Sequence, residues 1–240
     1  MKYLAFVATQ GAQPEDAVEY MHREWPAYQA ELDLRGGLRL GRELNHPPAA
    51  VTIRVRDGQV LVTDGPFTET KEFVAGFDLF EAADLNDAIK VESRSPVARF
   101  CPFEIRPFDG VVLGSEAPAF AKGDDSAGVP YLLTVWVEAA KPTSLKDQAV
   151  SEECDAWRGE LDGRRLFVLG GTLGGVETAT TLRFRDGEVR TSDGPFLNTE
   201  EFIAGIDVIR AADRQQATQV AATHPLARHH AIEVEQFYVG

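Results

Sequence analysis

The sequence of 240 residues lacks any long hydrophobic run. No apolar stretch approaches the roughly 18 consecutive residues of a membrane-spanning helix, so we expect no membrane segment. At the N-terminus, a short apolar run from Tyr3 to Val7 continues into a polar turn without a small-residue cleavage site. This pattern predicts an N-terminal strand rather than a secretion signal.

Cysteine is scarce, with two residues in the chain. Cys101 and Cys154 form no metal-binding spacing, and so low a content is typical of a reducing environment, which predicts a cytoplasmic location. His224, His229 and His230 lie close in sequence, but no carboxylate or cysteine falls at a recognised ligand spacing near them. We therefore predict no metal site.

Basic residues are few relative to acidic ones. Lysine and arginine total 24 against 38 acidic residues, and the net charge of −14 opposes binding to phosphate, so no direct contact with nucleic acid is expected. The glycine-rich run 170–175 lacks the lysine of a phosphate-binding loop and does not open a helix. We predict no nucleotide or other cofactor.

The sequence contains an internal duplication with an offset of 129 residues. The stretch Thr63–Phe67, which ends in Asp-Gly-Pro-Phe, recurs as Ser192–Phe196. Between residues 64–80 and 193–209, ten of the seventeen aligned pairs are identical. A period of this size corresponds to a whole domain, well above the 20–50 residues of solenoid repeats. We predict two copies of one domain, copy 1 at 1–109 and copy 2 at 130–240.

A linker is predicted between the copies, over residues 110–129, because this stretch is rich in Gly, Ala, Ser, Pro and Asp and has no sustained periodicity. Each copy reads as strand, helix, strand, hairpin, strand, helix and strand, with Asp57-Gly58 and Asp186-Gly187 as the hairpin turns. Asp84 and Asp213 precede the second helices as N-caps. This order predicts an α+β fold, with two helices on one face of a largely antiparallel sheet.

The first helix of copy 1 begins at Pro14 and carries an apolar stripe that includes Trp25. Pro26 lies inside this helix and is expected to kink or divide it near Trp25, since proline removes a backbone donor.

The pattern of copy 1 resembles the YCII-related superfamily, in its DGPF-domain branch. The resemblance rests on Val55–Gly58, Thr63–Glu72 and Gly76-Phe77, and it extends over both copies. It implies a ferredoxin-like fold for each copy. It also implies that the two copies pair inside the chain as a pseudo-dimer, a dimeric α+β barrel, which leaves homo-oligomers open.

The resemblance also implies candidate site residues. Related proteins have been proposed to use a helix histidine and an aspartate as an acid–base pair, which here gives His22 and Asp64 as catalytic residues. The family position of the histidine falls near Trp25, one helical turn after His22. The substrate-binding candidates are Trp25, Phe67, Arg99, Asp193 and Phe196.

Each candidate has a structural alternative. Asp64 and Asp193 would cap backbone amides in a turn, and Phe67 and Phe196 would be core or cleft-wall residues. His22 would be a surface histidine, and Arg99 would pair with a local acid. In copy 2, Ser151 and Cys154 stand where copy 1 has His22 and Trp25, while Asn198 and Glu200 replace Glu69 and Lys71, so we expect one competent site, built on copy 1.

Two functions from different classes follow. The first is the binding of a small carboxylated or enolic metabolite, with lyase or isomerase chemistry carried out by His22 and Asp64. The second is a non-catalytic module that binds a ligand or a protein partner. Because DGPF proteins often accompany extracytoplasmic-function sigma factors, a sigma factor is the partner that the resemblance suggests.

Overall fold

The computed structural model covers residues 1–240 and describes residues 1–11, 13–45, 49–67, 72–138, 147–196 and 200–239. The polar continuations of the two Asp-Gly-Pro-Phe motifs, at 68–71 and 197–199, lie outside the described residues, and so do the motif differences at positions 69, 71 and 198. Among the described residues, no helix is both long and apolar enough to cross a membrane.

The strands and helices follow the predicted order in both copies. The strands are β1 (Lys2–Thr9), β2 (Arg39–Glu43), β3 (Val51–Arg56), β4 (Gln59–Asp64), β5 (Phe73–Glu81), β6 (Phe103–Leu113), β7 (Val129–Glu138), β8 (Phe167–Leu173), β9 (Thr180–Arg185), β10 (Glu188–Asp193), β11 (Glu201–Ala211) and β12 (Ala231–Gln236). The helices are α1 (Glu15–Arg35), α2 (Leu85–Glu92), α3 (Ala117–Ala121), α4 (Gln148–Gly163) and α5 (Arg214–Ala222), with 3-10 turns η1 (Pro96–Arg99), η3 (Val176–Thr178) and η4 (Pro225–Arg228).

The local signals of the sequence are confirmed at turns and caps. Asp57 and Asp186 have φ of 51° and 54° and precede glycines that also have positive φ, as type I′ hairpin turns require. The side chain of Asp84 accepts a hydrogen bond from the Asp87 amide, and Asp213 caps α5 in the same way. The predicted division of the first helix at Pro26 is wrong, because α1 runs as one helix from Glu15 to Arg35, while a kink at this residue stays a prediction.

The chain divides into two compact units, and each unit contains segments of both copies. Unit 1 comprises residues 1–47, 70–108 and 174–198, and unit 2 comprises 48–69, 109–173 and 199–240. The hairpin β9–β10 of copy 2 thus belongs to unit 1, and the hairpin β3–β4 of copy 1 belongs to unit 2. The copies have exchanged their hairpins.

Strand pairing shows how each exchanged hairpin joins its unit. In unit 1, β9 pairs antiparallel with β6, with Phe103 opposite Leu182. In unit 2, β3 pairs antiparallel with β12, with Ile232 opposite Ile53. These two registers are identical after the offset of 129 residues, so both hairpins dock in the same way.

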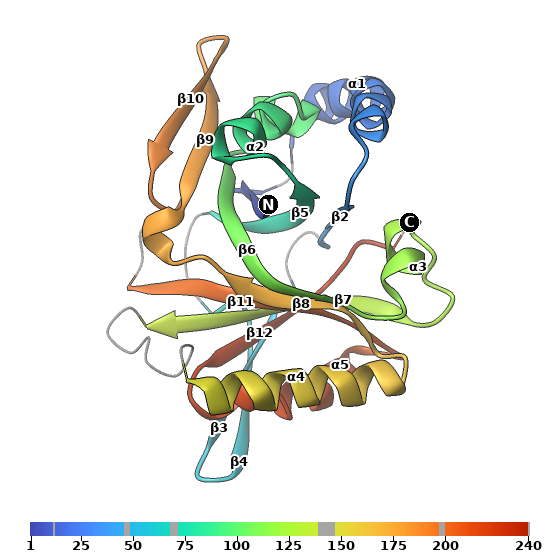
Figure 1. Ribbon diagram of the computed structural model, residues 1–240, viewed down its shortest axis with the longest axis vertical. Helices are drawn as coiled ribbons and strands as arrows, with labels where there is room; N and C mark the ends of the chain where they lie inside the picture. The colour runs from blue at the N-terminus through green and yellow to red at the C-terminus, as the bar shows by residue number, and fades with distance from the viewer. Residues whose placement is uncertain (12, 46–48, 68–71, 139–146, 197–199, 240) are drawn as a thin grey trace. The chain divides into compact units, whose positions relative to one another are not determined.

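The core of each unit has the ferredoxin-like arrangement. In unit 1 the strand order is β2-β5-β1-β6, and in unit 2 it is β8-β11-β7-β12, all antiparallel. Helices α4 and α5 cover one face of the unit 2 sheet, where Trp157, Leu161 and Val220 pack on its strands (Figure 1). In unit 1, Leu32 and Val91 pack in the same way. The predicted α+β, ferredoxin-like fold is confirmed for both.

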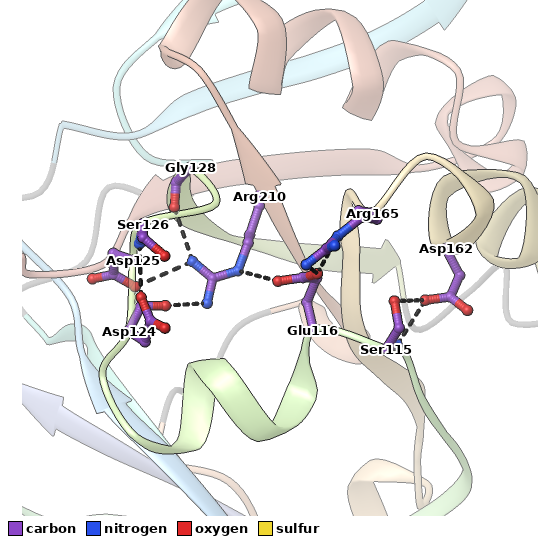
Figure 2. A network of polar contacts seen from close by, with 9 residues as sticks. All are labelled: Ser115, Glu116, Asp124, Asp125, Ser126, Gly128, Asp162, Arg165 and Arg210. Carbon is purple, nitrogen blue, oxygen red and sulfur yellow. Dashed lines mark hydrogen bonds and ion pairs between the residues drawn. The ribbon is translucent and has the colours of Figure 1, made fainter.

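The predicted linker carries regular structure and an internal salt-bridge network. Strand β6 continues to Leu113, helix α3 follows, and β7 begins at Val129. The guanidinium of Arg210 donates to the backbone oxygens of Asp124 (2.6 Å) and Gly128 (2.9 Å) and lies within ion-pair distance of Glu116 and Asp125 (Figure 2). Composition alone does not show this order, because one arginine, 81 residues further on than Val129, provides the contacts.

Candidate functional site

The two predicted catalytic residues lie in different units. His22 is exposed on α1 in unit 1. Asp64 ends β4 in unit 2, where its side chain is 92% exposed and Oδ1 lies 2.8 Å from Nη2 of Arg214. Asp193, at the end of β10, is also exposed. Neither unit contains both His22 and Asp64, so their acid–base role stays a prediction.

Phe67 and Phe196 follow the hairpins and anchor them to buried glutamates. The backbone N–H of Phe67 donates to Oε2 of Glu233 at 2.5 Å in unit 2, and that of Phe196 donates to Oε2 of Glu104 at 3.1 Å in unit 1. The ring of Phe67 also lies 5.5 Å from that of Trp136. The two positions share one docking contact, which identifies a structural role for both loops.

The negative charges of Glu104 and Glu233 are compensated in different ways in the two units. Glu104 lies 2.8 Å from Arg106, so its charge is paired. The equivalent of Arg106 in unit 2 is Glu235, whose pKa is raised well above its ordinary value by burial and then by Glu233. The pKa of Glu233 is also raised by burial, although Glu235 and the Phe67 amide oppose the shift by hydrogen bonding. The protonated carboxyl of Glu235 thus donates a hydrogen bond to the carboxylate of Glu233.

We expect Glu235→Gln to raise the free energy of unfolding at about pH 8 and to change it little at about pH 5. A carboxyl whose folded pKa is raised contributes stability below its unfolded pKa and loses it as pH rises through the folded pKa. Glutamine keeps a donor for Glu233 and cannot ionise. Urea unfolding at both pH values measures this, with the exposed Glu188→Gln as control; the same effect at both pH values would contradict it.

The remaining candidates, Trp25 and Arg99, lie in unit 1 and border a cluster of polar side chains. Trp25 packs on Tyr28 with 5.6 Å between ring centroids, and the Arg39 guanidinium lies 5.2 Å from the Tyr28 ring. Arg99 ends η1, and its guanidinium lies 4.9 Å from the ring of Tyr20. Helix α1 therefore presents aromatic rings toward both arginines.

A hollow of about 380 Å³ lies at this place in unit 1, between α1, the α2–η1 segment and β9. It is lined by Tyr20, Glu24, Ala27, Tyr28, Glu31, Ser93, Arg94, Ser95, Pro96, Arg99 and Phe184. A second hollow of about 250 Å³ shares Tyr28, Glu31, Ser93 and Arg94 with it. We call the first the α1–η1 hollow. His22 is not among its lining residues, since on a helix of 3.6 residues per turn it lies about half a turn from Tyr20 and Glu24.

Three buried oxygen atoms at or beside the α1–η1 hollow have no hydrogen-bond partner among the described residues. They are the Tyr28 hydroxyl, the Ser95 hydroxyl and Oε2 of Glu92. Tyr28 is 5% exposed, Ser95 4% and Glu92 1%. The two hydroxyls lie close to each other, and a contact between them that is too poor in geometry to satisfy either group lowers the pKa of the Tyr28 phenol. Leaving such groups unpaired costs about 1–3 kcal/mol each, so each requires a partner from water or from a ligand.

Burial and neighbouring carboxyl groups raise the pKa values of the acidic side chains around Tyr28. Burial, and then the nearby Asp78, raise the pKa of Glu92 well above its ordinary value. Burial also raises the pKa of Asp78 against the opposing effect of Arg39, and burial, Glu92 and Asp78 raise that of Tyr28. Both shifts favour the protonated forms of Tyr28 and Glu92, in which each group can donate a hydrogen bond. A ligand here would need acceptor oxygens.

The equivalent place in unit 2 has its polar groups satisfied. Trp157 replaces Tyr28 and donates to Thr223 at 2.9 Å. His224 replaces Ser95 and binds Asp207 at 3.1 Å through Nε2, while its Nδ1 accepts from a backbone amide. Arg158 donates to Asp207 at 2.7 Å. A cavity of about 50 Å³ in unit 2 lies elsewhere, against Ser151, Cys154 and Gly171, and shares His224 alone with the equivalent place. The hydrogen-bonding groups of the equivalent place are thus paired in unit 2.

Sequence reasoning missed most of the hollow, although signals for it were present. Glu92 stands on the apolar face of α2, together with Ala88 and Val91, where a charged residue is unusual. Asp78 interrupts an apolar strand and is one of the residues identical between the copies. Both positions place a carboxyl group where a hydrophobic side chain is expected.

Metal ligands do not gather in the part of the chain that the structure describes, where no three His, Cys, Asp or Glu side chains form a candidate site. The polar groups that line the α1–η1 hollow are hydroxyls, the guanidinium groups of Arg94 and Arg99, and the carboxylates of Glu24 and Glu31, which are paired with Arg23 and Arg94. These suit an organic ligand with acceptor oxygens.

Comparisons with known proteins agree with the repeat. The YCII-related domain model matches residues 1–109 and 132–238. An uncharacterised protein of Rhizobium meliloti (strain 1021) is 38% identical over 71 residues, which cover 30% of this chain and 57% of that protein, so the chain spans just over half the length of this relative.

Solved structures with similar folds include a candidate chlorite dismutase, with a TM-score of 0.44, 10% identity and coverage of 99% of this chain and 94% of that one. An anthrone oxidase-like protein has a TM-score of 0.36 and 9% identity, with 99% and 91% coverage. The family model covers most of the chain in two consecutive matches and confirms the resemblance to the YCII-related superfamily, while the DGPF-domain branch stays a prediction. The chain belongs to the YCII-related family and contains two copies of its domain.

Proposed function

We propose that the protein binds a small carboxylated or enolic metabolite in the α1–η1 hollow of unit 1. The observation that carries this proposal is the pair of buried hydroxyls without a hydrogen-bond partner of good geometry, because a ligand carboxylate, carbonyl or enolate would accept hydrogen bonds from Tyr28 and Ser95, which both line the hollow. In unit 2 the equivalent side chains, Trp157 and His224, already have hydrogen-bond partners in Thr223 and Asp207.

Arg99 is the cation that would hold the ligand's charge. Within the described residues it has no carboxylate at ion-pair distance, and its contacts are with aromatic rings. Its equivalent in copy 2, Arg228, is paired with Glu153. An arginine with no ionic partner at the rim of a polar hollow suits a carboxylate, which guanidinium binds with two parallel hydrogen bonds.

We expect Arg99→Gln to weaken ligand binding about tenfold or more, since hydrogen bonds to charged groups contribute about 1.5–3 kcal/mol. The measurement is a thermal-shift screen of small hydroxy-, keto- and enol-acids, followed by calorimetry on each ligand that stabilises the protein. Arg228→Gln is the matched control and should bind as the wild type does.

Tyr28→Phe should change stability and ligand binding in opposite directions. Because the hydroxyl has no partner without ligand, its loss should raise the free energy of unfolding by about 1 kcal/mol while it weakens binding. If the hydroxyl had a structural role, its removal would instead lower the free energy of unfolding. No binding by any acid, or equal binding by the Arg99 and Arg228 variants, would refute the proposal and favour the alternative of a module that binds a protein such as a sigma factor.

We also propose that the protein converts the bound acid by lyase or isomerase chemistry, with His22 and Asp64 as the acid–base pair. The test is turnover of a bound acid by His22→Ala and Asp64→Asn, with folding checked. Unchanged turnover in both would remove the pair from the mechanism.

A further inference from the structure

One wall of the α1–η1 hollow is aromatic and comes from the other copy. Phe184 lies on β9, in the hairpin that copy 2 contributes to unit 1, and it lines the hollow together with Tyr20 of α1. Both rings are half-buried. The hollow is therefore completed by a side chain that copy 1 does not contain.

The Arg99 guanidinium lies within cation–π distance of both rings, and Arg23 also contacts the Tyr20 ring. The Cζ of Arg99 lies 4.9 Å from the centroid of Tyr20 and 5.7 Å from that of Phe184. Contacts of this kind hold a guanidinium over aromatic faces without using its N–H donors. The donors thus stay available for a carboxylate, and little side-chain entropy is lost when it binds.

Unit 2 lacks every part of this arrangement. Ala149 stands at the position of Tyr20, Val55 at that of Phe184, and Arg228 contacts Glu153 instead. The two aromatic residues and the arginine without an ionic partner thus occur together in one copy of the site and are absent together from the other. Such joint occurrence indicates that they act on one ligand.

We infer that the ligand is an aromatic carboxylic acid, whose carboxylate binds Arg99 and whose ring packs against Tyr20 and Phe184. This inference rests on the proposed binding in the α1–η1 hollow and names its substrate class. The volume of about 380 Å³ holds a ligand with one aromatic ring. A keto or enol oxygen beside the carboxylate would reach toward the donors of Tyr28 and Ser95, which makes an aryl 2-oxo acid the best match. Packed aromatic rings add affinity beyond simple burial.

The test compares phenylpyruvate with pyruvate, because they share one 2-oxo acid head group and differ by the ring. By calorimetry on the full chain, the wild type should bind phenylpyruvate at least tenfold more tightly. Phe184→Ala should bring the two affinities close together, and Phe184→Leu, which keeps bulk without a ring, should lie between. Val60→Ala, an exposed change on the other hairpin, should keep the wild-type preference.

Each result decides between the two proposals. Equal binding of both acids by the wild type, or a preference that survives Phe184→Ala, would overturn the aromatic class, while a loss of both affinities in Arg99→Gln would still support the site. Binding of other acids but of neither probe would likewise overturn the aromatic class alone. Absence of binding by every acid would overturn both proposals.

Discussion

Arg210→Met should lower the free energy of unfolding by about 3–5 kcal/mol, the usual cost of removing one partner from a buried charge network. Arg210 is fully buried, and its guanidinium contacts Glu116, Asp125 and the carbonyls of Asp124 and Gly128 (Figure 2). Methionine would leave both carbonyls without this donor. Glu116, itself 2% exposed, would keep only its contact with Arg165 among those drawn.

Urea unfolding followed by tryptophan fluorescence measures this loss, since Trp136 and Trp157 both lie in unit 2. The matched control is Glu81→Gln, because Glu81 is the exposed equivalent of Arg210 in copy 1. Unfolding midpoints that agree between Arg210→Met and the wild type would show that the segment between the copies is held by other contacts.

Substitution of two equivalent aspartates should have opposite effects near neutral pH. Asp207→Asn should cost about 3–5 kcal/mol, because it removes the buried counter-charge of Arg158 and leaves it the exposed Asp155 at 3.5 Å. Asp78→Asn should be neutral or stabilising at about pH 8. The reason is the sign of each pKa shift: burial would raise the pKa of Asp207, but Arg158 and His224 outweigh it and hold the pKa low, whereas burial raises that of Asp78.

The pH dependence separates the two cases. A carboxyl with a depressed folded pKa, such as Asp207, contributes stability above its unfolded pKa and loses it as pH falls through the folded value. One with a raised pKa, such as Asp78, contributes below its unfolded pKa and loses stability as pH rises. Unfolding curves should therefore show the Asp207 deficit level above about pH 4, the ordinary carboxyl pKa, and shrinking as pH falls below it. The Asp78 variant should instead gain stability relative to the wild type as pH rises above about 4. An Asp207 deficit that is unchanged in acid would contradict this account.

Much of each copy could be predicted from local residues. Asp57-Gly58 and Asp186-Gly187 fix hairpin turns because both positions need positive φ, and Asp84 and Asp213 cap helices through their own side chains. These signals depend on a few neighbouring residues. They specify elements wherever the rest of the chain lies.

The exchange of hairpins could not be predicted in this way. Copies 1 and 2 carry nearly the same hairpin, so β3 and β9 offer the same pattern to β6 or β12. Local sequence does not distinguish pairing within a copy from pairing across copies. At Pro26, a local signal fails for the opposite reason. Proline disfavours a helix interior, but the packing of Ala17 and Tyr28 on the buried side of α1 outweighs this preference.

The candidate site was found from the sequence only at its edge. Arg99 was identified because the duplication repeats it as Arg228, whereas Phe184 was not, because its place in unit 1 depends on the exchange. Tyr28 and Ser95 are ordinary residue types at ordinary positions. Only burial without a hydrogen-bond partner marks them.

The exchange of hairpins also delays the pairing of strands during synthesis of the chain. Strand β6 pairs with β9 through residues 103–105 and 180–182, so its partner is synthesised 75 residues later. At about 5–20 residues per second, this leaves roughly 4–15 s in which that edge has no native neighbour. An open strand edge recruits other chains. Crowded polysomes would therefore favour pairing of β6 with the hairpin of an adjacent nascent chain, and slower initiation would favour pairing with its own.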